Sequence, residues 1–437
     1  MITRVVWYWL QLRHNQWLPR KKLEQLQFKK LKTIVSHAYE KVPFYRRLYD
    51  EHGVRPDILR TLDDIRKFPV LSKELVRDVP LEDRTAAGVD VSRCTLRTTS
   101  GSTGIPVKIL EDERSIDYLD AYHLRRLNVY GYRPWQKIIR LTTEPSGRES
   151  LGATGDARAG LMKRLRENRM KRLVVADNVN KHLETIMQER PKLIIASPSY
   201  FRVLAKTMRD RGISGVRPRV LVTWGEVLDE GTRAYISSSF GSEVYDGYGC
   251  TEAAPLGLAW ECKERVGLHI NMDVVLLEVL KNGEPVQPGE RGEVYVTSLF
   301  RTATPMIRYR LGDIVTLSDE TCPCGREMPL IKNIEGRLVD FLKMPDGRMI
   351  SPYAVMSAVE GIAGIAKYQF IQESLDRIVV TVERGRDFDP NTITQLKSAC
   401  NELFGRDLEL TVKEVESFPL VRGRKFRPVE SQIHMPQ

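Results

Sequence analysis

The sequence has few cysteines and no long apolar run. Only six cysteines occur among 437 residues, and they are unevenly placed, so we expect no disulfide framework and a reducing, cytoplasmic setting. No apolar stretch reaches the roughly 18–20 residues that a membrane-spanning helix needs. The first residues also lack an apolar region followed by a small-residue cleavage site. We therefore expect neither a transmembrane span nor secretion.

Acidic residues are outnumbered by basic ones. The 57 Asp and Glu residues against 68 Lys and Arg give a net charge of +11, which suits an anionic partner such as a nucleotide, a membrane or an acidic polymer. The chain lacks zinc-finger spacing and an aromatic-interleaved basic stripe, so we expect no nucleic-acid partner. Its length exceeds what one hydrophobic core usually holds, which predicts at least two domains.

A loop rich in hydroxyl side chains is the first candidate for a phosphate site. From Arg97 to Lys108 the chain reads Arg-Thr-Thr-Ser-Gly-Ser-Thr-Gly-Ile-Pro-Val-Lys. Glycine lets the backbone approach an anion closely, and Ser and Thr add hydrogen-bond donors. The loop lacks the Gly-Lys-Ser/Thr ending of a Walker P-loop and the spacing of a dinucleotide fingerprint. It indicates phosphate contact of another design or, as the plain alternative, only a loop.

The hydrophobic patterns predict an α/β chain in two parts. After helical segments at 20–85 and 115–130, short apolar runs alternate with helical stretches, which is typical of a mostly parallel, covered sheet. From about residue 265 the pattern becomes β, with a hairpin at Asn282-Gly283 and a turn-rich segment at 312–325. The tail has the mixed order of a small α+β domain. We expect a large multi-layer α/β domain at 1–339 and a small C-terminal α+β domain at 340–437.

Six motifs in one order resemble the adenylate-forming ligase superfamily of acyl-CoA synthetases and peptide-synthetase adenylation domains. They are Thr98-Thr-Ser-Gly-Ser-Thr-Gly-Ile-Pro106, Trp224-Gly-Glu226, Tyr248-Gly-Cys-Thr-Glu252, Arg308-Tyr-Arg-Leu-Gly-Asp313, Gly336-Arg-Leu-Val-Asp340 and Gly423-Arg-Lys425-Phe-Arg. The chain looks most like the phenylacetate-CoA ligase group and its relatives from capsule and exopolysaccharide clusters. The segments His37-Ala-Tyr-Glu-Lys-Val-Pro-Phe-Tyr45 and Phe68-Pro-Val-Leu-Ser-Lys73 carry that likeness, which covers nearly the whole chain.

The resemblance implies an ATP-dependent reaction in two steps. A carboxylate attacks the α-phosphate of ATP, which releases pyrophosphate and leaves an acyl-adenylate. A thiol, usually coenzyme A, then takes the acyl group. Such chemistry depends on alignment and charge stabilisation, so Mg2+ and a mobile lysine are expected parts. Residues 1–339 would bind ATP and the acid, and the domain at 340–437 would move and carry the lysine.

The resemblance also implies roles for individual residues. The ATP phosphates would lie against Thr99, Ser100, Gly101, Ser102, Thr103, Gly104 and Thr251, and the adenine against Gly225, Glu226, Tyr248 and the adjoining Gly249. Glu252 would hold Mg2+, since hard cations prefer oxygen ligands. Asp313 would accept hydrogen bonds from the ribose hydroxyls. Arg337 would sit at the nucleotide, Asp340 would be the hinge, and Lys425 would stabilise charge between the carboxylate and the α-phosphate.

Departures from the family pattern leave the acceptor open. Ile105 stands where many relatives carry lysine, and Trp224 replaces a small residue, which would narrow the nucleotide or acyl pocket. Met344-Pro-Asp-Gly347 replaces a glycine-rich turn that contributes to thioester formation in acyl-CoA ligases. The leading hypothesis is acyl transfer to coenzyme A. Its rivals are transfer to an amine or hydroxyl in glycan biosynthesis, and a nucleotide-binding scaffold without turnover.

Two further features carry expectations of their own. Cys262, His269, Cys322 and Cys324 form a Cys3His set suited to a structural Zn2+ site, and the family resemblance supports it; the alternative is a turn with buried thiols. The first nineteen residues place three tryptophans beside basic residues. That segment is interpreted as a capping helix or, alternatively, as a peripheral contact with the inner face of a membrane.

Overall fold

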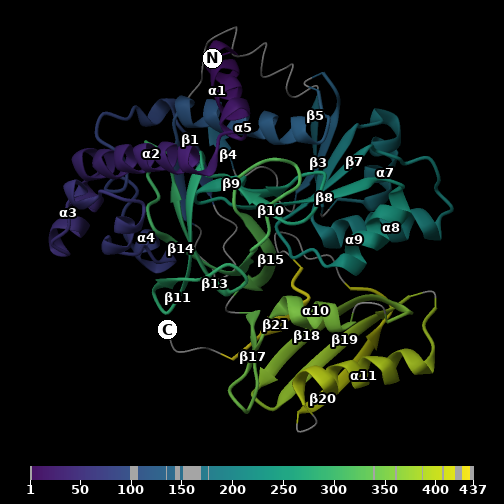
Figure 1. Ribbon diagram of the computed structural model, residues 1–437. Coiled ribbons are helices and arrows are strands. Elements are labelled where there is room, and N and C mark those ends of the chain that lie inside the picture. Colours follow the sequence, from purple (N-terminus) through teal and green to yellow (C-terminus); the bar gives the residue numbers. More distant parts are fainter. Residues whose placement is uncertain are drawn as a thin grey trace.

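The computed structural model of the chain describes residues 2–98, 107–133, 135–142, 148–150, 169–175, 177–337, 340–359, 362–385, 387–405, 408–418 and 426–433. It shows a wide sheet covered by helices and, below it in the view of Figure 1, a smaller C-terminal unit. The prediction of a multi-layer α/β fold with a β-rich segment and a small α+β part is confirmed.

One half of the wide sheet is parallel. Its strands, in spatial order, are β8 (Glu243–Cys250), β7 (Val220–Trp224), β6 (Leu193–Ala196), β3 (Ile138–Thr142) and β5 (Met170–Val174). All four residues of β6 are buried, as expected for a parallel strand covered on both faces. The connecting helices are α7 (Val179–Glu189), α8 (Pro198–Asp210) and α9 (Glu230–Phe240). Ser197, Asp229 and Asn178 cap these helices with their side chains, which satisfies free N–H groups at each start.

The other half of the sheet is antiparallel. It continues through β9 (Ala254–Glu261), β10 (Leu268–Ile270), β15 (Leu330–Arg337), β14 (Tyr309–Leu317), β13 (Arg291–Ser298), β11 (Val275–Lys281) and β12 (Glu284–Pro285). Asn282 and Gly283 have φ of 54° and 84°, as a type I′ turn requires, so the predicted hairpin is confirmed. The predicted turn-rich segment at 312–325 is wrong in its first part. Gly312 (φ 78°) and a register shift at Ile314 accommodate an irregular strand there.

A small separate sheet flanks the hydroxyl-rich loop. It consists of β2 (Lys108–Glu111), β1 (Thr95–Thr98) and β4 (Arg148–Ser150), with β1 in the middle. Residues 99–106 of the loop lie outside the described residues. The antiparallel pairing of Thr98 with Lys108 holds the two described ends of the loop side by side.

The helices of the N-terminal part of the chain pack against the wide sheet. They are α1 (Ile2–Asn15), α2 (Arg20–Lys41), α3 (Pro43–Glu51), α4 (Lys73–Asp78) and α5 (Glu113–Val129), with short 3-10 turns at Pro56–Ile58, Asp63–Lys67 and Val91–Arg93. Helix α1 packs on α5, where Trp9 Nε1 donates to Asn128 Oδ1 at 2.9 Å, as the capping interpretation requires. No helix in the described part of the chain is long and apolar enough to cross a bilayer.

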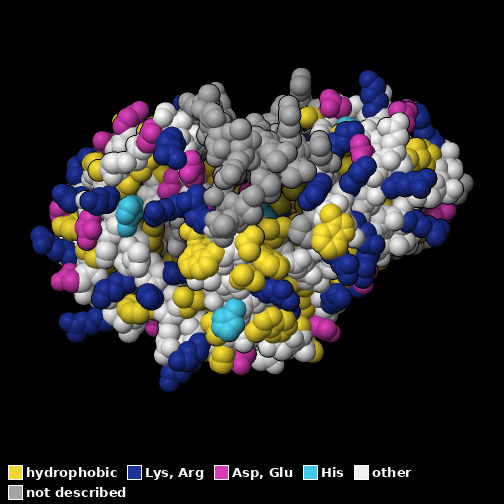
Figure 2. Space-filling model, turned by 90° about the horizontal axis from the view of Figure 1, so that it is seen from above, with side chains coloured by type: hydrophobic (Ala, Val, Ile, Leu, Met, Phe, Trp, Pro, Cys, Tyr) yellow, Lys and Arg dark blue, Asp and Glu magenta, His cyan; other side chains and the backbone are white. Residues whose placement is uncertain are grey.

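The exposed face of α1 carries large apolar side chains. Trp7 and Leu10 of α1, and Trp17 just after it, keep more than half of their surface exposed. Viewed from above, hydrophobic side chains gather near the middle of the molecule, with Lys and Arg side chains spread around them (Figure 2). The N-terminal helix therefore has one face in the core and another on which apolar and basic side chains are exposed together.

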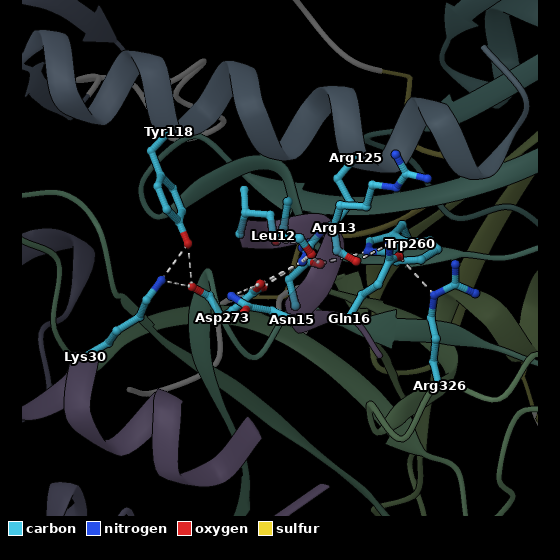
Figure 3. Close-up of polar contacts among 12 residues, drawn as sticks. Leu12, Arg13, Asn15, Gln16, Lys30, Tyr118, Arg125, Trp260, Asp273 and Arg326 are labelled. Atoms are coloured by element: carbon cyan, nitrogen blue, oxygen red, sulfur yellow. Dashed lines mark hydrogen bonds and ion pairs between the residues drawn. The ribbon is translucent and has the colours of Figure 1, made fainter. Parts of the chain in front are cut away.

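A buried ion pair ties α1, α2 and α5 to the sheet (Figure 3). Arg125 Nη1 lies 2.8 Å from Asp273 Oδ2, and both side chains are almost fully buried. Lys30 Nζ donates to the Asp273 backbone oxygen and to Tyr118 Oη, both at 2.6 Å. Burial lowers the pKa of Lys30 to about 8. The network joins α1, α2 and α5 to the turn before β11.

The C-terminal unit has its own sheet and core. Its sheet has the order β20 (Glu409–Val415), β19 (Arg377–Arg384), β18 (Ile365–Ser374) and β21 (Val429–Ser431), beside the pair β16 (Leu342–Lys343) and β17 (Met349–Ile350). The helices α10 (Pro352–Val359) and α11 (Pro390–Phe404) complete it. Asp389 forms a capping box at α11, so the predicted helix at 390–404 is confirmed. Its apolar residues form a separate core that includes Phe370, Val380 and Leu396.

Candidate active site

Residues from three strands meet around Tyr248. Its buried hydroxyl donates to Asp313 Oδ2 at 2.7 Å. Arg337 of β15 pairs in register with Asp313 of β14, and Arg337 Nε lies 3.6 Å from Asp313 Oδ1. Burial lowers the pKa of Arg337, but Asp313 and Glu252 outweigh burial and raise it. Three residues from three separate motifs thus form one charged group.

The turn between β8 and β9 carries Thr251 and Glu252. Arg301, fully buried, donates to the backbone oxygens of Ala253 at 3.0 Å and Thr251 at 3.1 Å. These hydrogen bonds hold the backbone of the turn in place. A Cβ on Gly249 would lie 2.2 Å from Leu256 N, so only glycine fits this close strand approach.

Glu252 lies among groups that belong to the same site. Its Oε1 is 3.4 Å from Tyr309 Oη. The negative charge of Glu252 raises the pKa of Arg337. Burial and the positive charge of Arg337 lower the pKa of Lys73, and the charge of Glu252 partly offsets that decrease. A carboxylate flanked by two cations is set up to face a charged ligand.

The segment Trp224-Gly225-Glu226 lies between β7 and the C-terminal unit. Gly225 has φ of 79°, which turns the chain after β7. Glu226 accepts from Ser199 N at 3.0 Å and from Ser199 Oγ at 2.9 Å. Its carboxylate is therefore fixed at the N-terminal end of α8, where the helix dipole favours a negative charge.

The C-terminal unit contacts the wide-sheet part at the same place. Arg202 of α8 donates to the Ala366 backbone oxygen. A cavity of about 50 Å³ is lined by Glu226, Lys367 and Phe426, among others. Arg427 Nη1 lies 3.0 Å from Asp340 Oδ1, so the predicted hinge residue is bonded to the segment that follows Lys425.

The predicted phosphate-binding loop and the predicted catalytic lysine are not among the residues that the structure describes. Thr99, Ser100, Gly101, Ser102, Thr103 and Gly104, and also Lys425, lie outside the described residues. Their described neighbours are Thr98 at the end of β1 and Phe426 at the cavity with Glu226. The roles of these residues stay predictions.

The predicted Cys3His set is assembled in space. The ligand atoms of Cys262, His269, Cys322 and Cys324 all lie within 4.8 Å of one another. Cys262 Sγ is 3.4 Å from Cys322 Sγ, and Cys324 Sγ is 3.4 Å from His269 Nε2. At a zinc–sulfur distance near 2.3 Å, tetrahedral geometry gives sulfur–sulfur distances of about 3.8 Å. The residue types and spacings therefore fit a closed zinc site.

Comparison with known proteins places the chain in a family. Residues 170–301 match the family of AMP-binding enzymes, and residues 342–432 match the CapK C-terminal domain. The phenylacetate-coenzyme A ligase of Thermus thermophilus is 31% identical over 85% of this chain and 83% of its own length. The enzyme of the same name from Escherichia coli is 32% identical over 73% of this chain and 72% of its own.

The chain belongs to the phenylacetate-CoA ligase family. It is an AMP-forming acid–thiol ligase by that membership. A crystal structure of 2-hydroxyisobutyryl-CoA ligase in the postadenylation state matches it with a TM-score of 0.81, at 21% identity, over 96% of this chain and 91% of the other. That likeness shows a shared fold.

Three residues to which the sequence analysis gave no role lie around the Glu252 turn. Arg301 fixes the Glu252 turn, and Tyr309 and Lys73 lie around Glu252. Tyr309 and Lys73 do occur inside quoted motifs, and Leu71 pairs with Tyr309 in an isolated bridge. No sequence pattern pointed to Arg301, because its role depends on a turn about fifty residues earlier in the chain.

Proposed function

We propose that the chain couples ATP to a carboxylic acid, forms an acyl-adenylate with release of pyrophosphate, and transfers the acyl group to the thiol of coenzyme A. The observation that carries this proposal is the group formed by Tyr248 of β8, Asp313 of β14, Arg337 of β15 and Glu252 in the turn after β8. Membership of the phenylacetate-CoA ligase family supplies the reaction class.

The side chains divide the work by their chemistry. Asp313 accepts from the ribose hydroxyls, a role for which it must exchange part of its contact with Arg337. Gly225, Glu226, Tyr248 and Gly249 border the adenine. Thr251 and the loop at 99–104 donate to phosphate oxygens. Arg301, bonded to the Thr251 backbone, positions this turn.

Glu252 is the residue we assign to Mg2+. Its carboxylate supplies oxygen atoms, the ligands that this cation prefers. Glu252 lies in a turn whose backbone is hydrogen-bonded to Arg301. When bound, Mg2+ supplies neutralisation of the phosphate charge. The negative charge of the Glu252 carboxylate acts on both Arg337 and Lys73.

Residues 340–437 are proposed to be a mobile unit that delivers Lys425. The separate core of residues 340–437 supports a movable unit. Asp340 is the proposed hinge, and Phe426, next to Lys425, lines the cavity with Glu226. An ammonium on a moving unit suits a charge needed in only one half-reaction.

The acceptor is tested by the mass of the product. The protein is incubated with ATP, Mg2+, a panel of carboxylic acids and either coenzyme A or an amino sugar. The proposal expects AMP and an acyl-CoA thioester. An amide or ester of the sugar formed in preference would replace coenzyme A as acceptor.

We also infer that Cys262, His269, Cys322 and Cys324 hold a structural Zn2+. The loop that carries Cys322 and Cys324 continues to Arg326, whose guanidinium stacks on Trp17 with 4.1 Å to the ring centroid. Arg326 Nε also donates to Gln16 at 3.1 Å. The site would thus fix the loop against which the end of α1 packs.

Metal removal should therefore loosen the N-terminal helix. The purified protein is expected to contain about one Zn2+ per chain, and Cys322→Ser should lose it and lower the free energy of unfolding by about 3 kcal/mol. Trypsin should then cut near residue 20 faster. Cys94→Ala, a change outside the Cys3His set, should keep the metal. Zinc content near zero in wild type, with no response to chelator, contradicts this inference.

We infer a third property, contact of α1 with an anionic membrane surface. Val6, Trp7, Leu10 and Trp17 are exposed, and the basic side chains of Arg13, Lys21 and Lys22 are exposed nearby. Apolar anchors beside cations suit the headgroup region of an anionic bilayer. No described helix spans the bilayer, so contact would be peripheral.

Vesicle binding tests this contact. Wild type is expected to sediment with phosphatidylglycerol vesicles at low salt and much less at 0.5 M salt. The double change Trp7→Ser and Leu10→Ser should reduce binding at least about tenfold. Leu375→Ser alters an apolar side chain that is similarly exposed on the C-terminal unit, and it should bind as wild type does. Equal binding by all three proteins rules the α1 surface out.

A further inference from the structure

A group of buried guanidinium side chains lies beside the candidate site without matching negative charge. Arg126 of α5 is 1% exposed. Its Nε and Nη1 are buried and find no hydrogen-bond acceptor among the residues that the structure describes. Burial of a charged group without a partner costs free energy. The position therefore calls for an anion.

Arg140 of β3 adds a second such cation. It pairs in register with Arg172 of β5, and like charges placed opposite each other on neighbouring strands are destabilising. The Nε of Arg140 is also buried and lacks an acceptor in the described ranges. Burial first, and then Arg172, Arg126 and Arg97, lower the pKa of Arg140 to about 9. The arginines thus repel one another.

Two buried carboxyl groups of neighbouring strands already have other partners. Glu111 of β2 is fully buried and forms ion pairs with Arg97 and Arg301, both at 2.9 Å. Asp246 of β8 accepts instead from Thr223 Oγ1 at 2.6 Å. Burial and the neighbouring Glu261 raise the pKa of Asp246 to about 7. Neither carboxyl group is seen to pair with Arg126 or Arg140 in the described part of the chain.

The two arginines touch the segments that form the candidate active site. Arg126 Nη1 lies 2.9 Å from the position that a Cβ on Gly247 would take, and Gly247 precedes Tyr248. The Arg140 guanidinium lies 4.6 Å from the centre of the Trp224 ring, and Trp224 precedes Gly225. Both contacts lie at the carboxyl ends of β7 and β8, the edge at which parallel sheets bind their ligands.

We propose that Arg126 and Arg140 bind a second anionic group on the carboxylic acid substrate. The acid would carry a carboxylate or a phosphate in addition to the carboxylate that receives AMP. This proposal rests on the proposed ligase function. Guanidinium groups bind such oxyanions in a planar, bidentate manner. An acid without a second anionic group would leave Arg126 and the Nε of Arg140 without an acceptor among the described residues, which selects against it.

Matched pairs of acids test this proposal through ATP-dependent adenylate formation. Phenylacetate is compared with 4-carboxyphenylacetate, and butyrate with succinate. The proposal expects the acid with the second carboxylate to have the higher kcat/KM, by about 100-fold or more. If no acid of any class supports adenylate formation by wild type, the proposed function itself has failed.

Substitutions then locate the effect. Arg126→Met and Arg140→Met should each raise the KM for the preferred diacid at least tenfold, leave the KM for ATP unchanged and reduce the preference over the monoacid. Arg126→Lys should recover part of the affinity. Arg133→Met, which removes an exposed arginine that stacks on Trp135, should behave as wild type.

Three results would overturn the proposal while the ligase function stands. One is that the acids with a single carboxylate are preferred. Another is that Arg126→Met raises the KM for ATP instead, which would assign the arginines to the nucleotide phosphates. The last is that the variants change thermal stability and no kinetic constant, which would mean that the chain itself neutralises the arginines.

Discussion

Lys425→Ala is expected to reduce acid-dependent exchange of pyrophosphate into ATP by about 100- to 1000-fold, the loss typical when one group that stabilises developing charge is removed. The thermal midpoint should stay within about 1 °C of wild type, since the role proposed for Lys425 is in the reaction. Binding of ATP should weaken much less than the rate falls, because the ammonium is proposed to act on the reacting carboxylate and α-phosphate.

The control for this change is another lysine of the C-terminal unit. Lys413 lies exposed on β20, so Lys413→Ala alters the same charge without the proposed role and should exchange at the wild-type rate. If Lys425→Ala exchanges as fast as Lys413→Ala, then Lys425 is not the catalytic lysine. The rest of the site assignment would stand.

Asp273→Ala is expected to lower the free energy of unfolding of the large sheet and its helices by about 3–5 kcal/mol, because it leaves a buried, unpaired Arg125. Arg125 donates to Asp273, to Asn271 at 2.6 Å and to the Leu12 backbone at 3.1 Å. The residues it joins come from α1, α5 and the turn before β11 (Figure 3). Loss of the carboxylate should therefore loosen α1 along with the core.

Urea unfolding followed by tryptophan fluorescence measures this loss. Trp260 donates to Asn271 at 2.8 Å, so its emission reports on the same region. Asp210→Ala breaks an ion pair with Lys206 at the surface of α8 and should cost less than about 1 kcal/mol. Equal losses for the two variants would show that the buried pair does not stabilise the fold as described.

Much of the fold follows from local sequence. The capping box at Asp389, the Asn282-Gly283 turn and the fully apolar β6 each depend on a few neighbouring residues, and these features were predictable. The strand over Tyr309–Leu317 was not, because Gly312 and a register shift interrupt its alternation. Its place in the sheet is decided by pairing with distant strands.

The candidate site was predictable only as far as motifs reach. Tyr248, Glu252, Asp313 and Arg337 stand in recognisable segments, and the structure brings their side chains together. The arginines at 126, 140 and 301 were missed because an arginine on a helix or strand usually lies at the surface. The burial of Arg126, of Arg301 and of the Arg140 Nε depends on packing between elements that lie far apart in the chain.

Pyrophosphate exchange into ATP tests the central claim most directly. Wild-type protein with ATP, Mg2+ and labelled pyrophosphate is predicted to form labelled ATP only when a suitable carboxylic acid is present, and Asp313→Ala should reduce that exchange at low ATP concentration. Exchange that needs no acid, or no exchange with aromatic, aliphatic, hydroxy, amino or dicarboxylic acids at saturating ATP, would contradict the account.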